Sequence, residues 1–329
     1  MLNYISKRLA IMIAILIVIS IGSFAMVHLL PGDIATVILG TADTPANRRN
    51  LYKQLGLDRN VVVQYWIWMK HVLVGNLGQS YISHEKVTTI ILKALPVDLE
   101  IIFLSQILAL GCAIPLAMKA ARRPNGLFDR ISNTISFGLL SVPSFIIVVY
   151  AVLVIAILIK IPNTGPASFV RFPSWSELFS SPGDFFSTLR LNLLSMTIPA
   201  IAGAIASFVI YFRTLRSDMV STLQEEFITM ARSKGLRTRR IMWKHAFRPS
   251  SVALLSTIGI NVGGALAGGF VVQYLLAIPG LGTTLIAAIT TKNYLLIQGI
   301  VLVVAVAVIV LNFAIDFLTT IIDPRISRD

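Results

Sequence analysis

The sequence predicts an all-α, polytopic membrane protein with six transmembrane helices and one large basic loop, folded as a single domain over residues 1–329. First, 56% of the residues are hydrophobic, 13% are charged and the mean hydropathy is +0.81, a balance too apolar for a water-soluble surface. Second, six apolar runs are long enough to cross a bilayer as helices. Third, Lys and Arg concentrate in two of the connecting loops.

The first apolar run follows Lys7 and Arg8 and extends over 22 residues, 9–30. As an α-helix it would be about 33 Å long, which spans the hydrocarbon core of a bilayer. A secretory signal has a shorter apolar core and a small-residue cleavage site, so we expect a retained span. Five more spans are predicted, at about 98–118, 131–159, 191–215, 251–277 and 294–322.

Loop charge predicts the orientation of the chain. Residues 119–130 hold four basic side chains and one acid, and residues 213–248 hold nine basic and three acidic side chains. Cationic loops stay on the cytoplasmic side, so both loops and, with an even number of spans, both termini are predicted to be cytoplasmic. The 31–97 loop is then external, because long translocated segments largely escape the charge rule.

Two of the predicted external segments have a distinct pattern. Residues 61–77 place apolar side chains at helical spacing and include two tryptophans. We expect either a helix on the outer membrane interface or a small helix packed on the bundle. Residues 160–190 are rich in Pro, Ser and aromatic residues and are expected to form an ordered loop without regular structure.

The sequence argues against several functional classes. It has no G-x-x-x-x-G-K-[ST] phosphate-binding loop, no G-x-S-x-G and no H-E-x-x-H, so we expect no catalytic residue and no cofactor held by this chain. The four histidines lack ligand spacing, which predicts no metal site. Cys112 lies in an apolar run and is expected to be buried. A net charge of +13 without aromatic interleaving fits membrane loops, and we expect no nucleic acid as a partner.

The large loop at 216–250 contains two predicted short helices. Ser221 with Gln224 and Thr222 with Glu225 form overlapping capping boxes, which predict that the first helix starts there. Acids in its first turn and basic residues in its last turn match the helix dipole. Gly235 is the expected left-handed stop.

One face of this first helix is apolar. Its predicted stripe, which a helix in a loop must bury against another surface, consists of Leu223, Phe227, Met230 and Ala231. The second helix is predicted to begin at Thr238 and to end at Pro249.

At these residues the chain resembles the EAA loop of ABC-importer permeases, in the variant of the oligopeptide, dipeptide and nickel branch. There an acidic pair precedes an aromatic residue and A-x-x-x-G, here Glu225, Glu226, Phe227, Ala231 and Gly235. The similarity to the first permease of that branch extends along the chain. It includes Pro-Gly-Asp at 31–33, Leu-Gly-Leu-Asp at 55–58, Gly-Asn-Leu-Gly-Gln-Ser at 75–80, Pro-Gly-Leu-Gly at 279–282, Gln-Gly at 298–299 and Asp-Pro-Arg at 323–325.

The resemblance implies an inner-membrane permease surrounded by lipid, with a homologous second permease, two ATPase subunits and an extracytoplasmic substrate-binding protein as partners. ATP and magnesium would be bound by the ATPases and not by this chain. The loop would transmit their motion as a coupling helix. Its candidate coupling residues are Glu225, Glu226, Phe227, Ala231, Lys234 and Gly235.

The resemblance also implies a substrate class, with oligopeptides or dipeptides first and nickel chelates as the alternative on the same scaffold. The spans contain no His or Met cluster, which favours peptides. A channel or a secondary carrier would have no reason to keep the 216–250 loop. An enzyme acting in the membrane would need a catalytic pair inside the spans, and the sequence lacks one.

Four residues are candidates for the substrate pathway: Asp98, Glu100, Asn261 and Gln273. Asp98 and Glu100 are expected at the outer end of the second span, where a carboxylate could hold a peptide amino terminus, although two residues apart they point to different faces. The other interpretation is that they are solvated acids at a helix start. Gln273 stands where the resembling permeases usually have Glu, so pocket contacts cannot be carried over from them.

Overall fold

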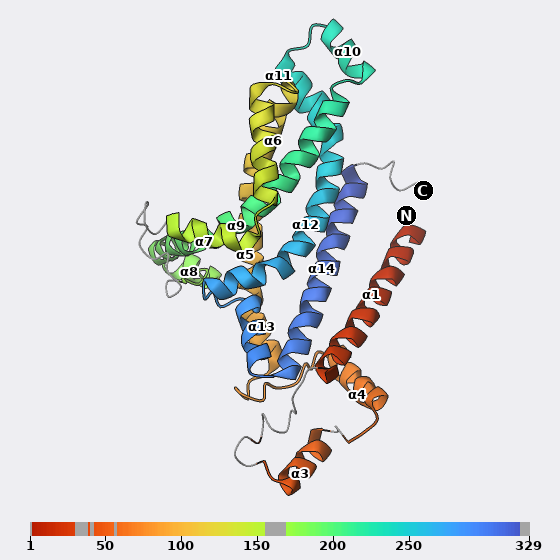
Figure 1. The fold of residues 1–329 in the computed structure, drawn as a ribbon, viewed down its shortest axis with the longest axis vertical. Coiled ribbons are helices and arrows are strands. Elements are labelled where there is room, and N and C mark those ends of the chain that lie inside the picture. Colours follow the sequence, from red (N-terminus) through yellow and green to blue (C-terminus); the bar gives the residue numbers. More distant parts are fainter. Residues whose placement is uncertain (1, 30–38, 40–42, 56–57, 155–168, 323–329) are drawn as a thin grey trace. The chain divides into compact units, whose positions relative to one another are not determined.

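The fold is described by a computed structural model over residues 2–29, 39, 43–55, 58–154 and 169–322. It is 82% helical, and its described residues contain no β-strand beyond one isolated bridge between Gln79 and Lys86. The all-α prediction is therefore confirmed. The helices group into two units, Met1–Val97 with Pro279–Ile309 and Asp98–Ile278 with Val310–Asp329 (Figure 1). Both units contain part of α5 (Val87–Arg122) and of α14 (Tyr294–Ile322).

In the first unit, α4 (Val61–Leu73) packs against α1 (Leu2–Leu29). The Tyr65 hydroxyl shares a 2.8 Å hydrogen bond with Ser20 Oγ, and the Tyr65 ring meets the Phe24 ring edge-on at 5.4 Å between centroids. Edge-to-face geometry is a favoured arrangement of two aromatic rings. The helix predicted within 61–77 is therefore present, and one side of it packs on an apolar helix.

Two further helices of the first unit lie in segments that were predicted only as loops. They are α3 (Pro45–Leu55) and α13 (Leu281–Thr290). Both are too short to cross a bilayer, so the length of an apolar run, which predicts spans, does not indicate them. The 277–294 connection therefore contains a helix that starts directly after Gly280.

Gly299 of α14 lies where a neighbouring helix comes very close. A Cβ atom at this position would be 2.6 Å from Val87 Cγ1 and 3.3 Å from Ile91 Cδ1, both on α5. Val87 is fully buried and branched at Cβ, so its side chain has little freedom to move aside. The close packing of α14 against α5 therefore explains why the Gln-Gly pair at 298–299 has a glycine at its second position.

We expect Gly299→Ala to lower the free energy of unfolding by about 1–3 kcal/mol, because added volume forces neighbouring side chains off their rotamers. Gly22→Ala in α1 is the matched control, since nothing lies within 4 Å of its Cβ position. Alanine there should be neutral or slightly stabilising, as the better helix former. Thermal unfolding of both purified variants in detergent measures the difference, and equal stabilities would contradict the close approach.

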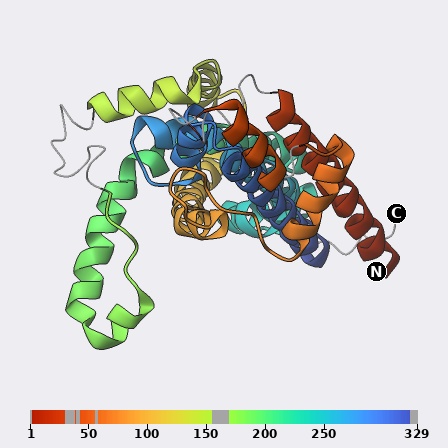
Figure 2. The same ribbon diagram turned by 90° about the horizontal axis from the view of Figure 1, so that it is seen from below.

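The second unit holds most of the long helices and the helices of the large loop. Its elements are α6 (Leu127–Leu140), α7 (Ser144–Val154), α8 (Trp175–Ser180), α9 (Pro182–Thr222), α10 (Glu226–Ser233), α11 (Thr238–Arg240), the π-helix η3 (Ile241–Ala246) and α12 (Phe247–Leu275), with the remaining parts of α5 and α14. Figure 1 shows α6 beside α9, with α10 and α11 at the end where α9 stops. Figure 2 shows α8 next to the N-terminal part of α9.

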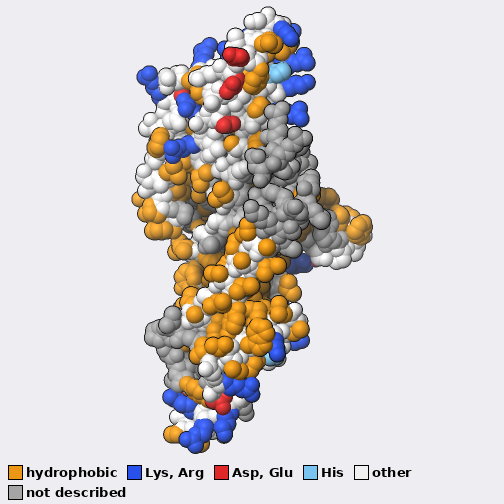
Figure 3. Space-filling view, turned by 90° about the vertical axis from the view of Figure 1, so that its right-hand side faces the viewer, with side chains coloured by type: hydrophobic (Ala, Val, Ile, Leu, Met, Phe, Trp, Pro, Cys, Tyr) orange, Lys and Arg blue, Asp and Glu red, His pale blue; other side chains and the backbone are white. Residues whose placement is uncertain are grey.

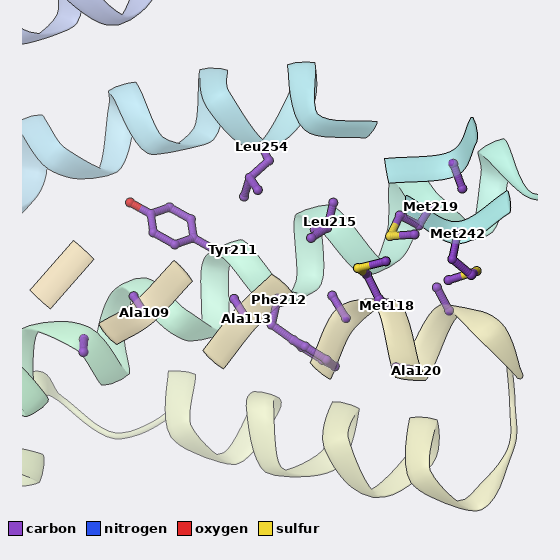
Figure 4. Close-up of a cluster of buried hydrophobic side chains, with 14 residues drawn as sticks. Ala109, Ala113, Met118, Ala120, Tyr211, Phe212, Leu215, Met219, Met242 and Leu254 are labelled. Atoms are coloured by element: carbon purple, nitrogen blue, oxygen red, sulfur yellow. The ribbon is translucent and has the colours of Figure 1, made fainter. Parts of the chain in front are cut away.

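The core of the second unit forms where small side chains of α5 meet large ones of α9 (Figure 4). Alanine recurs every fourth residue on α5, which puts one small stripe along the helix. Between apolar helices in lipid the hydrophobic effect adds little, so close van der Waals packing holds such helices together. The stripe is Ala109, Ala113 and Ala117, and the large side chains in the same cluster include Tyr211, Phe212 and Leu215.

Four helices of the described chain are long and apolar enough to cross a membrane. They lie at Val87–Arg122, Pro182–Thr222, Thr238–Leu266 and Tyr294–Ile315, over the predicted second, fourth, fifth and sixth spans. Helix α1 covers the predicted first span, but the apolar stretch found in it, Ala10–Met26, is shorter than these. The count of six spans stays a prediction.

The predicted third span, 131–159, is not a single helix in its described part. Helix α6 ends at Leu140 and α7 begins at Ser144. Pro143 accounts for the break, because proline lacks an N–H and disfavours helical backbone at the residue before it. Residues 155–159 lie outside the described residues, as do the motifs at 31–33 and 323–325.

Two other predictions are wrong. The 160–190 segment contains α8, which starts with a capping box between Ser174 and Glu177, and α9 begins at Pro182. Serine followed three residues later by glutamate is the pattern that predicts the start of this helix. Cys112 is exposed, because it lies on α5 next to the buried alanine stripe and not within it.

Candidate functional site

The chain between α9 and α10 starts a new helix later than the capping boxes predict. Helix α9 continues to Thr222, and α10 begins at Glu226 with Glu225 as its N-cap. The Thr222 hydroxyl does not cap a helix but makes a 3.2 Å hydrogen bond with Ser250 Oγ. The predicted start at Ser221 and Thr222 is therefore wrong, because a contact with a residue far along the chain occupies the capping side chain.

Helix α10 is anchored by two side chains. Ile228 and Ala231 are buried against Ile241 of η3. By contrast, Phe227 is 45% exposed and Met230 is 61% exposed. The predicted apolar stripe is thus divided: Ala231 faces inward with Ile228, which the sequence reading missed, while Phe227 and Met230 face outward. The helix presents an apolar outer face that nothing in the described chain covers.

Gly235 ends α10 in the predicted way. Its φ is +72°, the left-handed region that favours glycine. The Gly235 N–H donates to Arg232 O at 2.9 Å, and the Leu236 N–H donates to Ala231 O at 3.3 Å. These two bonds are the Schellman pattern of helix termination, and Leu236 packs on the Ile228 cluster beside it.

The second loop helix begins at Thr238 as predicted but does not end at Pro249. Helices α11, η3 and α12 follow one another without a break, so the helix runs from the loop to Leu275. A proline cannot donate to the carbonyl four residues before it, and the π-helical turn at Ile241–Ala246 directly precedes this region. The loop is therefore joined to α12 by continuous helix.

The end of the second unit that carries α10 and α11 is strongly basic, and Figure 3 shows Lys and Arg side chains gathered there with a few acids among them. Glu225, Glu226 and Lys234 are all exposed on this surface. An apolar patch inside a charged rim is typical of a protein–protein contact.

Asp98 is not a solvated acid at a helix start. Helix α5 begins at Val87, so Asp98 lies inside the helix and is only 1% exposed. Its Oδ1 accepts a 2.8 Å hydrogen bond from Nε2 of Gln273 on α12, which is buried as well. The structure therefore brings two predicted pathway residues together, as a carboxylate held by an amide.

Glu100 lies on another face of α5, as its two-residue separation from Asp98 predicts. Its carboxylate lies beside the side chain of Asn192 on α9, which is completely buried. Asn192 also donates to Val170 O at 2.9 Å. Among the described residues, Glu100 Oε1 has no hydrogen-bond partner. Glu100 therefore belongs to an α5–α9 contact and not to the Asp98 pair.

Asn261, the fourth predicted residue, is part of a polar network across three helices. Its Nδ2 donates to Ser207 Oγ at 2.8 Å and to the Tyr211 hydroxyl at 3.0 Å, and that hydroxyl donates to Gln106 Oε1 at 2.5 Å. The sequence reading missed these three partners, because single polar residues on separate helices have no spacing pattern.

Asn261 and Gln273 line the same cavity between α5, α9 and α12. Its volume is about 180 Å³. Pockets for drug-sized ligands measure about 300–1,000 Å³, so this cavity suits a few water molecules better than a peptide. In the observed arrangement these polar groups join helices more than they offer a substrate pocket.

Residues 113–328 match the family described as the binding-protein-dependent transport system inner membrane component, and residues 1–102 match the N-terminal region of such membrane components. The chain belongs to this family. It is a multi-pass ABC-importer permease of the dipeptide, oligopeptide and nickel branch, and its homologues are permease subunits and not enzymes.

Relatives match along almost the whole permease. The dipeptide transport system permease protein DppB of Lactococcus lactis is 32% identical over 99% of this chain and 99% of its own length. The nickel import system permease protein NikB of Staphylococcus aureus is 30% identical over 97% of this chain and 90% of its own length. A putative peptide transport system permease protein of Brucella abortus is 29% identical over 98% of both chains.

Proposed function

We propose that this permease forms, with a homologous second permease, the membrane pathway for peptides that an extracytoplasmic binding protein delivers. Two ATPase subunits bind ATP and magnesium, and one of them docks on α10. Both termini and the 216–250 loop lie on the cytoplasmic side of the inner membrane, because that loop carries the largest excess of basic side chains.

The observation that carries this proposal is the construction of α10. Its inner face is fixed by Ile228 and Ala231, its end is fixed by Gly235, and its outer face leaves Phe227 and Met230 uncovered. Continuous helix then connects the loop to α12. A push on α10 would therefore reach a membrane helix as a rigid-body displacement, which is how a docked ATPase can favour one arrangement of the spans.

Cysteine labelling tests the proposed orientation. In a variant with Cys112 replaced by Ser, a single cysteine at Lys234 should react with a membrane-impermeant maleimide only after the cytoplasmic side is opened. A single cysteine at Lys53 of α3 should react from outside in intact cells, since it lies in the proposed external loop. Labelling of position 234 from outside would contradict the orientation.

The substrate can be identified on the binding protein, because that subunit selects what the permease receives. We expect mass spectrometry of ligand released from the cognate binding protein to show peptides. A nickel complex would instead support the alternative, which the similarity to NikB keeps open. Within the described residues no three His, Cys, Asp or Glu side chains come together, so nickel would cross with its chelator.

A further inference from the structure

A groove of about 820 Å³ lies between α6, α9 and α12, apart from the cavity at Asn261. It is at the end of α9 that leads into α10, which in the proposed orientation is the cytoplasmic end. Its volume falls within the range of small-ligand pockets, about 300–1,000 Å³. The polar side chains that line it are Asn133, Arg213, Thr214, Ser217, Asp218 and Ser221.

Arg216 also lines the groove, but its guanidinium is already paired with a carboxylate. Its Nε and one terminal nitrogen donate to Asp129 at 2.9 and 2.5 Å. Arg213 differs, because its guanidinium lies over the Phe137 ring, 4.1 Å from the centroid, and no carboxylate of the described chain pairs with it. Asp218 likewise has no ion-pair partner among the described residues.

The groove therefore presents one unpaired cation and one unpaired carboxylate on the same helix, with hydroxyl and amide groups between and around them. The cation–π contact with Phe137 holds the Arg213 guanidinium, and its N–H groups can still donate to an anion. Apolar side chains, Phe137, Leu140, Ile210 and Ala253, form the remaining wall. A ligand that satisfies all of these groups has one positive end, one negative end and an apolar body.

We propose that this groove binds a peptide with free termini on its way into the cell, with the carboxylate on Arg213 and the ammonium on Asp218. The inference rests on the proposed function. The hydroxyls of Thr214, Ser217 and Ser221 are available to the peptide backbone, and the apolar wall accepts side chains without selecting among them. Binding is weak, since a pathway site must also release its ligand.

The test uses the assembled transporter in nanodiscs, isolated through a tag on this chain and without binding protein. Saturation-transfer NMR measures binding of Leu-Leu, of N-acetyl-Leu-Leu and of Leu-Leu-amide. We expect Arg213→Gln to weaken Leu-Leu about tenfold while leaving the weaker Leu-Leu-amide unchanged. Asp218→Asn should weaken Leu-Leu similarly and leave N-acetyl-Leu-Leu unchanged. Arg213→Lys keeps the charge and should retain most of the binding.

Arg190→Gln is the matched control, an exposed arginine of α9 outside the groove, and should bind all three probes like the wild type. Equal losses for free and blocked dipeptides, or no wild-type binding at about 10 mM, would overturn the inference. So would loss of co-purified phosphatidylethanolamine in both variants with unchanged dipeptide binding, since the groove would then hold a lipid. Import of Leu-Leu by the wild-type transporter with its binding protein tests the proposed function separately.

Discussion

Gly235→Val is expected to lower ATP-driven import to roughly a tenth of the wild-type rate or less. Position 235 has φ +72°, and a β-branched residue there costs about 1–2 kcal/mol, close to a tenfold change in an equilibrium. Relief of that strain would break the two terminal hydrogen bonds and tilt α10 away from Ile241. Import and binding-protein-stimulated ATP hydrolysis by the reconstituted transporter measure the effect.

Asparagine tolerates the left-handed region, so Gly235→Asn should keep most of the activity and serves as the control for position 235.

Phe227→Ala tests the outer face of α10, where loss of an aromatic anchor should weaken ATPase association about tenfold or more. Its matched control is Phe179→Ala, an 84% exposed phenylalanine on α8 that lies outside the loop. Glu226→Lys should also weaken coupling, because it puts a positive charge at the N-terminus of α10. Wild-type coupling in Gly235→Val, Phe227→Ala and Glu226→Lys would remove the proposed role of the loop.

Asp129→Ala is expected to destabilise the second unit by about 3–5 kcal/mol, the cost of leaving a largely buried ion pair without one partner. Asp129 is 2% exposed and Arg216 22% exposed. The carboxylate also accepts hydrogen bonds from the Asn125 N–H at 2.8 Å and from Asn133 Nδ2 at 2.9 Å. All of these donors would lose their acceptor. Unfolding in mixed detergent, followed by circular dichroism, measures the loss.

The exposed pair of Lys93 and Glu85 is the control for this prediction. Lys93 is 69% exposed, so Lys93→Gln should change stability by no more than about 0.5 kcal/mol. Replacing Asp129 and Arg216 together by Leu and Met should recover much of the lost stability, because no charge then stays unpaired. A single Asp129→Ala variant as stable as the wild type would show that the pair does not hold α6 to α9.

The same pair makes stability depend on pH in a defined direction. Burial alone would raise the pKa of Asp129, but the hydrogen bond and charge of Arg216, with the bonds from Asn125 and Asn133, outweigh it and lower the pKa. Its contribution is therefore fully present above the unfolded pKa of about 4 and is lost as the pH falls through the lowered folded value. Asp129→Ala should remove this acid-dependent part of the stability curve.

Local sequence patterns correctly predicted those structural features that depend only on residues close together in the chain. The apolar run at 294–322 coincides with α14, and Gly235 ends α10 because only its own backbone conformation is involved. The family followed from short motifs along the chain. Pro143 also has a local effect, and it could have predicted the break between α6 and α7.

Tertiary structure decided whatever depends on contacts between distant residues. Thr222 bonds to Ser250, so α9 does not end where the capping boxes predict. Asp98 is buried because Gln273 comes from another helix to meet it. Asp129 comes from α6 to pair with Arg216 of α9, whereas Arg213 of the same helix lies over the Phe137 ring. A side chain has many chemically equivalent partners along a chain, and only the packing of the helices selects which of them lies within hydrogen-bonding distance.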